Sequence, residues 1–374
     1  MFDHFDQLHE IERRSGLGDK LEYIHVVLCA NFPFLARIAV ALYDHKTDQL
    51  TTFVHSSGAD NPLPHYTTKL SEAPSLQEIL ACGRPRVIND LQVTAGGERS
   101  HTQRILGQGY RASYTQAIYH RGQLFGFLFF NAYEADCFTG DVLDRLDPFA
   151  HLIALTVISE LAAMYTLAGT VRAARDMAHA RDEETGAHLD RMARYARLIA
   201  MAIADRHGLS DEQIEHIFLF APLHDIGKIA IPDAILLKPA QLDTAERRLM
   251  QTHARRGREL VDKLLGNFGL EGASHIGVLR NIVEFHHETV DGAGYPDGLP
   301  GADIPIEARI VAVADVFDAL TSERPYKRAW SNDDAFAMLE QLTETKLDGD
   351  CVAALRAHRA EVEAIQRQFR ESAV

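Results

Sequence analysis

The first 140 residues alternate short apolar runs with polar turns, a pattern typical of an antiparallel sheet flanked by helices. A helical pattern over residues 17–32 leads into strand patterns at 35–43 and 49–55. The further elements predicted here are a loop at 58–64, a short helix at 75–81, an edge strand at 86–90, and strands at 114–119 and 123–131 joined by a hairpin turn at 120–122. An antiparallel sheet with helices at both ends predicts an α+β domain.

Residues 141–180 form a long helical pattern in which apolar side chains recur at heptad spacing. The members of this apolar seam are Leu146, Ala150, Ile153, Val157, Met164, Leu167 and Val171, and Glu160 interrupts them. Such a seam is typical of a parallel coiled coil that joins two protomers and carries a signal along the chain. The alternative is a helix that packs on its own domain. We interpret the segment as a linking helix, and a homodimer is the preferred reading.

Beyond residue 170 the pattern becomes almost entirely helical. Helices are predicted at 189–204, 211–223, 244–265, 276–287, 306–321, 333–342 and 352–369. Prolines lie at or near several of these boundaries, where a residue without a backbone N–H is tolerated best. The sequence therefore predicts an all-α second domain.

Composition and charge narrow the classes of function. The chain has 374 residues, which is enough for two domains that each bury a core. The formal net charge of −15 argues against a broad basic surface for a nucleic-acid polymer. An anionic ligand would therefore be held locally, by metal ions or by a few placed cations.

No targeting signal or membrane span is expected. The first residues lack the cationic and apolar regions of a signal peptide. Residues 149–168 are mostly apolar, but His151 and Glu160 would make a membrane span costly. The four cysteines form no CxxC pair, as expected of reduced thiols. We interpret the chain as a cytoplasmic protein.

Candidate chemistry centres on residues 221–228, where an apolar run is followed by His224, Asp225, a glycine and Lys228. Further candidate metal ligands in the second half are Glu184 with His188 four residues on, His253, the adjacent His286 and His287, and Asp315 in an apolar helix. Imidazoles combined with carboxylates fit Fe, Mn or Zn better than Mg. Because these ligands exceed what one ion needs, a multinuclear centre is predicted.

The geometry of a helix suggests how these histidines are shared. If His286 and His287 are both helical, their side chains point about 100° apart, which suits two metals better than one. The other histidines of the second half are assigned to surfaces or helix ends: His179, His207, His216, His275 and His358.

The first half resembles a GAF domain over residues 18–160. The features that carry the resemblance are the opening helix and strand, the segment Gly83–Asp90, the hairpin Gly122–Gly126 and a closing helix. The resemblance implies a sensory module, and GAF ligands range from cyclic nucleotides to tetrapyrroles. The ligand stays open, because the histidines of this half show no ligand spacing.

The second half carries five motifs in a fixed order: Glu184-Thr-Gly-Ala-His188, His224-Asp225-Ile-Gly-Lys228, His286-His287-Glu288, Asp291-Gly-Ala-Gly294-Tyr295-Pro296 and Thr321-Ser-Glu-Arg324-Pro-Tyr-Lys327. In this order they resemble the HD-GYP family of cyclic di-GMP phosphodiesterases, within the HD metallohydrolase superfamily. The resemblance covers about residues 170–365, and we expect the domain to occupy 170–374. It implies that the metal ligands are Glu184, His188, His224, Asp225, His253, His286, His287 and Asp315. It also implies two or three divalent ions, most often iron or manganese, with Asp225 bridging two of them.

The same resemblance implies roles for several neighbours of the ligands. Asp225 and Lys228 would be catalytic, with Lys228 neutralising charge that develops on the phosphate. Arg324 and Lys327 would hold a phosphate, and Tyr295 would stack on a guanine or contact a phosphate. The alternatives are a surface lysine, a solvated cation pair and a loop anchor, respectively. Gly292 and Gly294 are expected to allow a sharp turn through backbone angles closed to other residues.

These features predict a two-domain signalling enzyme in which a GAF-like sensor controls a metal-dependent phosphodiesterase. The expected substrate is cyclic di-GMP, and the expected product is linear pGpG, cleaved further to GMP if both bonds are processed. Protein partners would bind through the loop around Tyr295. One alternative is a phosphohydrolase for another cyclic dinucleotide or a nucleotide. The other is a cyclic di-GMP receptor that works through protein partners with little turnover.

Overall fold

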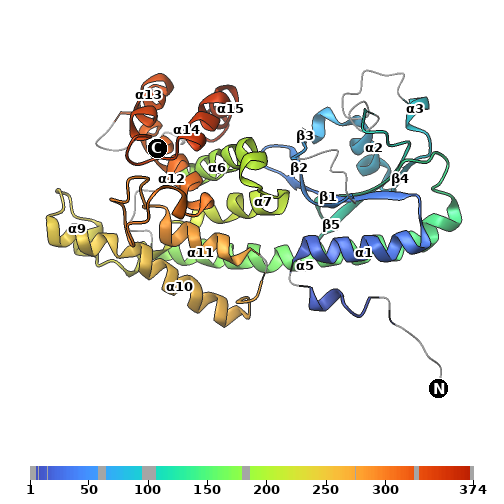
Figure 1. Cartoon of the computed structure of the whole chain (residues 1–374), viewed down its shortest axis with the longest axis horizontal. Coiled ribbons are helices and arrows are strands. Elements are labelled where there is room, and N and C mark those ends of the chain that lie inside the picture. The colour runs from blue at the N-terminus through green and yellow to red at the C-terminus, as the bar shows by residue number, and fades with distance from the viewer. Residues whose placement is uncertain are drawn as a thin grey trace. The chain divides into compact units, whose positions relative to one another are not determined.

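The computed structural model describes residues 6, 8–14, 16–57, 65–94, 107–178, 186–273, 275–323 and 328–370. The chain divides into two compact units, Met1–Ala162 and Ala163–Val374 (Figure 1). The loop predicted at 58–64 lies outside the described residues.

The first unit is built on one antiparallel sheet. Its strands are β1 (Leu35–Asp44), β2 (Gln49–Ser56), β3 (Thr67–Lys69), β4 (Arg86–Ile88), β5 (Ala112–His120) and β6 (Gln123–Ala132), in the order β3-β2-β1-β6-β5-β4. The tight turn at Arg121 and Gly122, both at positive φ, sets the register of β5 against β6. The predicted α+β class is confirmed. β3 was missed because three residues are too few to show alternation.

Helices cover both faces of this sheet, and the strands alternate accordingly. Ile38 and Val40 of β1 point to the face covered by α1 (Leu17–Asn31) and the first part of α5 (Gly140–Ala178). Phe127 of β6 points to the other face, under α2 (Pro74–Cys82). Figure 1 shows α1 and α2 on opposite sides of the strands. The short helices of this unit are η1 (Ile11–Arg13), η2 (Leu70–Glu72) and α3 (Leu91–Thr94).

The apolar seam of α5 is buried within the chain itself. Leu146, Ala150, Ile153 and Val157 belong to the core of the first unit. Met164 and Leu167 belong to the core of the second unit, and the side chain of Val171 lies outside the described residues. These six side chains therefore support the alternative of a helix that packs on its own domain. A coiled coil would need the same six side chains for its contact with a second protomer.

Residues 140–170 of α5 are long and apolar enough, by length and composition, to cross a membrane. In the structure, however, this segment packs against protein. Its seam fills the cores of the two units, and Glu160 accepts a hydrogen bond from Lys20 at 2.5 Å within the first unit. The ion pair explains why a carboxylate interrupts the seam.

The second unit is helical throughout its described residues. Its α-helices are α6 (Gly186–His207), α7 (Asp211–Phe220), α8 (Asp233–Leu236), α9 (Thr244–Gln251), α10 (His253–Phe268), α11 (Ile276–Phe285), α12 (Ile306–Thr321), α13 (Asn332–Leu342), α14 (Gly349–Ala357) and α15 (Arg359–Gln368). The 3-10 helices are η3 (Ala221–Leu223), η4 (Ile226–Ala230) and η5 (Gly301–Asp303). The predicted all-α class is confirmed.

Three predicted helices differ from those observed. The segment 244–265 is divided at Thr252 into α9 and α10, and 352–369 is divided at His358 into α14 and α15. The segment 211–223 leaves the α-helical form after Phe220, where Pro222 has no N–H to donate and the chain tightens into η3. The breaks at Phe220 and Thr252 place His224 and His253 at the ends of helices.

Candidate metal centre

Seven of the eight predicted metal ligands lie in the described part of the chain, and they form two adjoining groups. Asp225, His253, His286 and His287 make one group, and His188, His224 and Asp315 make the other. Within each group the ligand atoms lie within 4.8 Å of one another. The eighth, Glu184, lies outside the described residues. Residues up to 127 positions apart in sequence therefore offer ligand atoms in one place.

Asp225 lies between the two groups, with one carboxylate oxygen toward each. Its Oδ1 is 3.1 Å from Nε2 of His253 and 3.6 Å from Nε2 of His286. Its Oδ2 is 3.3 Å from Nε2 of His224, which in turn is 4.0 Å from Oδ1 of Asp315. If two cations bind, each could therefore be held through a different oxygen of Asp225.

Four of the histidines are held in a single tautomer by the groups behind them. Nδ1 of His224, His253 and His286 lies 3.0, 2.8 and 2.9 Å from the main-chain oxygens of Ala221, Met250 and Ile282. An oxygen can only accept, so each Nδ1 carries a proton, and in the neutral imidazole the lone pair is then on Nε2. Imidazoles that ligate metals are oriented in this way by hydrogen bonds behind them. The donor set therefore fits divalent metal ions.

Asp318 holds the fourth histidine and was not assigned a role from the sequence. Its side chain is fully buried and accepts a hydrogen bond from His188 Nδ1 at 2.7 Å. Arg191 also donates to it, from Nε at 2.7 Å and from Nη2 at 2.9 Å, and Ser322 Oγ donates at 2.8 Å. The signal that could have found it is its place on α12, three residues after Asp315.

Burial and neighbouring charges keep the centre in the protonation state that ligation requires. Burial alone would raise the pKa of Asp225, but its neighbours, above all the charge of Lys228, outweigh burial and hold the pKa well below its usual value. Burial lowers the pKa of His286, although Asp225 opposes the shift. Burial and the adjacent His286 lower the pKa of His287 well below its usual value. The carboxylate is thus ionised and these imidazoles are neutral near pH 7.

The adjacent pair His286 and His287 behaves differently from the expectation. Both offer a ligand atom to the same group, and their ring centroids are only 4.1 Å apart. The reason is that α11 ends at Phe285, so the pair lies in the turn that follows and the helical angle of about 100° does not apply.

The loop that follows the pair is held by Glu288, which the sequence placed in a motif without a role. Its carboxylate is buried. It accepts hydrogen bonds from the backbone N–H groups of Asp297 at 2.7 Å, Gly298 at 3.1 Å and Leu299 at 2.9 Å. Tyr295 is thereby held against the centre, with its ring centroid 4.7 Å from that of His287. The carboxylate organises the loop.

The two loop glycines are needed for different reasons. Gly292 has a φ of 74°, as expected of a turn that other residues rarely adopt. Gly294 does not have a positive φ, which corrects the expectation for that position. A Cβ there would instead lie 2.4 Å from the backbone nitrogen of Thr289 and 2.6 Å from the oxygen of His287. The requirement at Gly294 is close approach of two backbone segments.

We expect Gly294→Ala to destabilise the second unit by about 1–3 kcal/mol, because the added methyl group must displace backbone. Thermal unfolding followed by circular dichroism measures this. Gly277→Ala is the matched control, since a Cβ at Gly277 meets nothing within 4 Å and alanine favours the helix. A Gly294→Ala variant as stable as Gly277→Ala would refute the packing account of this loop.

Three further residues were predicted for the site: Lys228, Arg324 and Lys327. Only Lys228 lies in the described part of the chain. Nζ of Lys228 is 2.6 Å from Oδ2 of Asp225, so this cation stands beside the proposed bridge. Arg324 and Lys327 are not described. Asp291 accepts hydrogen bonds from Thr289 Oγ1 and the Ala293 N–H, so its carboxylate braces the loop.

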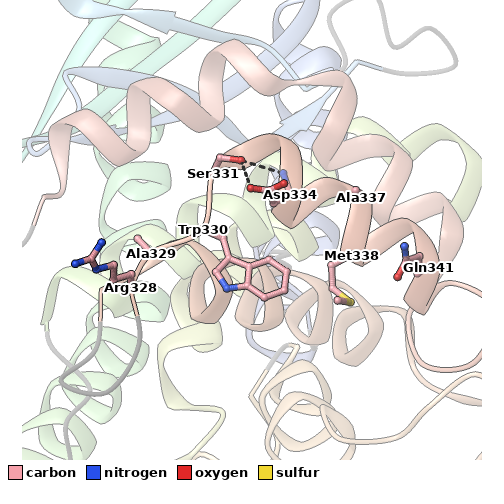
Figure 2. A pocket seen from close by; sticks show the side chains of 8 residues that line it. All are labelled: Arg328, Ala329, Trp330, Ser331, Asp334, Ala337, Met338 and Gln341. Carbon is pink, nitrogen blue, oxygen red and sulfur yellow. Dashed lines mark hydrogen bonds between the residues drawn. The ribbon is translucent and has the colours of Figure 1, made fainter.

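A separate surface hollow follows residues 324–327 along the chain. Figure 2 shows the indole of Trp330 and the side chain of Met338 lining it, beside the cap in which Ser331 bonds to Asp334. The other lining residues are Arg328, Ala329, Ala337 and Gln341. The seven described ligands do not line this hollow, so we assign it no part in the chemistry.

Comparison with known families identifies the second half of the chain. Residues 172–351 match the family model of the HD domain. This match falls in the part of the chain where the motifs predicted a domain of the HD superfamily.

The curated relatives of this half are phosphodiesterases of cyclic dinucleotides. The cyclic di-GMP phosphodiesterase response regulator RpfG of Xanthomonas campestris is 49% identical over 189 residues, covering 50% of this chain and 47% of the relative. The cyclic di-GMP phosphodiesterase of Thermotoga maritima is 37% identical over 191 residues, covering 51% and 49%. The 3'3'-cGAMP-specific phosphodiesterase 2 of Vibrio cholerae is 41% identical over 170 residues, covering 46% and 29%. The chain thus spans about half or less of the length of these relatives.

Solved structures similar to this chain include GAF domains. One is the phycocyanobilin-bound GAF domain from a cyanobacterial phytochrome, at 16% identity and a TM-score of 0.34, covering 42% of this chain and 96% of that one. Another is the GAF domain of an Acinetobacter phosphoenolpyruvate-protein phosphotransferase, at 13% identity and a TM-score of 0.33, covering 42% and 90%. The evidence for the α+β class of the first unit is its own six-stranded sheet with flanking helices.

Proposed function

We propose that this chain is a metal-dependent phosphodiesterase that hydrolyses cyclic di-GMP to linear pGpG, and further to GMP if both bonds are cleaved. The observation that carries the proposal is the set of imidazoles whose Nδ1 atoms are bonded from behind while their Nε2 atoms meet at Asp225. A histidine-and-carboxylate set fits iron, manganese or zinc, and the resemblance to the HD-GYP family implies iron or manganese. The names of the relatives support the substrate class.

The metal ligands we propose are His188, His224, Asp225, His253, His286, His287 and Asp315, with Glu184 as an additional ligand if a third ion is bound. When bound at such a centre, divalent cations supply Lewis-acid chemistry for the hydrolysis of a phosphoester. The bridging position of Asp225 supports two ions. The count of two or three is what the resemblance to the HD-GYP family implies.

The chain's own side chains then bind and orient the substrate. Lys228 keeps a fixed positive charge 2.6 Å from Asp225, where it can stabilise negative charge on a phosphoryl oxygen. Tyr295 offers a ring beside His287 for a base or a hydroxyl for a phosphate. We assign Arg324 and Lys327 to the second phosphate by their motif position alone.

A second candidate substrate is 3'3'-cGAMP, since a relative 41% identical to this chain is named for it. The test is to incubate the full chain, loaded anaerobically with Fe²⁺ or Mn²⁺, with each cyclic dinucleotide separately and to separate the products by chromatography. The proposal predicts linear pGpG from cyclic di-GMP and slower turnover of 3'3'-cGAMP. Faster turnover of 3'3'-cGAMP would reassign the substrate, and tight binding of cyclic di-GMP without product would favour a receptor.

We further propose that the first unit, within residues 18–160, is a GAF-like sensor that regulates the phosphodiesterase domain at 170–374 through the helix at 141–180. The α2 face of the sheet holds a small cavity of about 30 Å³, and the ligand of this unit stays open. Among the cavity's lining residues, Arg37, Thr52 and Asn131 are buried polar side chains.

We propose that the protein is a cytoplasmic homodimer and that protein partners bind at the loop around Tyr295. Leu155 of α5, 64% exposed, supports a further contact of this helix.

A further inference from the structure

A second cluster of metal-ligating side chains lies outside the centre described above. Glu212, His216 and His275 bring their ligand atoms within 4.8 Å of one another. Glu212 and His216 are buried and one helical turn apart on α7, and His275 precedes α11. The sequence had assigned both histidines to surfaces or helix ends. That is wrong for His216, which is only 4% exposed because its ring packs against Phe220 and His275.

His216 is oriented as a ligand, and His275 packs against it. Nδ1 of His216 lies 2.7 Å from the main-chain oxygen of Glu212, so this nitrogen carries the proton and Nε2 carries the lone pair. The ring of His275 lies 4.9 Å from that of His216, at an angle of 34°. His275 has a φ of 56°, a backbone conformation uncommon outside glycine that recurs at functional sites.

The separation between the ligand atoms of His275 and Glu212 agrees with tetrahedral coordination. Nε2 of His275 is 3.3 Å from Oε2 of Glu212. Two ligands bonded at about 2.0–2.1 Å to a tetrahedral Zn²⁺ lie about 3.3–3.4 Å apart. Two imidazoles and one carboxylate, with water in the fourth position, are a common donor set for this ion.

We propose that Glu212, His216 and His275 bind one transition-metal ion, with Zn²⁺ the best fit, at a site separate from the catalytic centre. The ion would join the first turn of α7 to the residue that starts α11. α7 leads through η3 to His224 and Asp225, and α11 ends immediately before His286 and His287. The ion would therefore fix the two helices whose far ends carry four of the proposed catalytic ligands.

The test measures zinc rather than catalysis. Metal-stripped full-length protein is equilibrated with Zn²⁺, desalted and analysed for bound zinc, and crystals soaked in Zn²⁺ are examined by anomalous diffraction at the zinc edge. We expect wild type to hold one equivalent more than His275→Ala, and an anomalous peak between the three side chains. A zinc-dependent rise in the unfolding temperature, followed by the fluorescence of Trp330, should shrink in the same variant.

His207→Ala is the matched control. His207 lies in the same unit, its side chain is 21% exposed against 23% for His275, and it lies 3.7 Å from a single carboxylate, that of Asp350. This control should keep the zinc content of wild type. Equal zinc in wild type and His275→Ala, an equal loss in both variants, or no anomalous peak at the cluster would overturn the proposal and leave an ion pair between Glu212 and His275.

Discussion

Replacing Asp225 with asparagine is expected to lower the rate of cyclic di-GMP hydrolysis on the order of 10³-fold, the scale of losing one charged group aimed at a reaction centre. The substitution keeps the shape of the side chain but removes the negative charge that both ligand groups share. Metal content should fall in parallel, because the imidazoles around it would then surround a neutral amide. Steady-state rates with saturating Mn²⁺, together with the metal content of each preparation, measure this.

The control is Asp262→Asn, because Asp262 is a carboxylate of the same unit that pairs with Arg258 and Arg280 and is 41% exposed. It should retain the rate and the metal of wild type. Hydrolysis by Asp225→Asn within tenfold of wild type would remove Asp225 from the bridging role. Binding of cyclic di-GMP by this variant, measured by calorimetry, separates loss of chemistry from loss of the site.

The largest expected effect on stability comes from Asp318→Ala. This carboxylate is fully buried and hydrogen-bonded to His188, Arg191 and Ser322. Burial alone would raise its pKa, but the hydrogen bonds from His188 and Arg191 outweigh it and lower the pKa, so the group is ionised in the folded chain. Its removal strands the charge of Arg191 in the core, and we expect a loss of about 3–5 kcal/mol in the free energy of unfolding.

Trp330, the single tryptophan, lies in the second unit and gives a local signal for this measurement. Urea unfolding of the metal-free protein, followed by its fluorescence, reports the stability of that unit. Asp262→Ala breaks two partly exposed ion pairs, with Arg258 and Arg280, each of which should contribute no more than about 1 kcal/mol. Equal losses in the two variants would contradict the account of Asp318. In the milder Asp318→Asn, metal affinity should fall about 10–100-fold, because His188 loses an ionised acceptor.

Sequence reasoning succeeded where the signal was local. The strands β1 and β6 and the helix α12 show a regular pattern of apolar residues in the sequence. Each was predicted within three residues of its observed ends. Five of the seven described candidate ligands lie in the motifs, since a histidine next to an aspartate after an apolar run is a local pattern, and the structure brings all seven together. The strand β3 was not found, because three residues show no period.

The sequence could not show interactions between distant residues. The bond from His188 to Asp318 spans 130 positions, and the bonds from Glu288 to the loop depend on how the chain turns back after His287. The apolar seam of α5 was correctly seen as apolar, yet a heptad pattern does not tell which partner covers it. The cluster at Glu212 was overlooked for the same reason, since His275 joins it only through the packing of α11 on α7.

Hydrolysis of cyclic di-GMP by the metal-free full chain, measured anaerobically while Mn²⁺ is added stepwise, tests the central proposal most directly. The account predicts no product without metal and release of linear pGpG that begins as Mn²⁺ fills the groups on both sides of Asp225. Unchanged hydrolysis in the absence of metal would contradict it. Intact cyclic di-GMP in a fully metal-loaded protein would contradict it equally, and would leave a receptor as the better description of this chain.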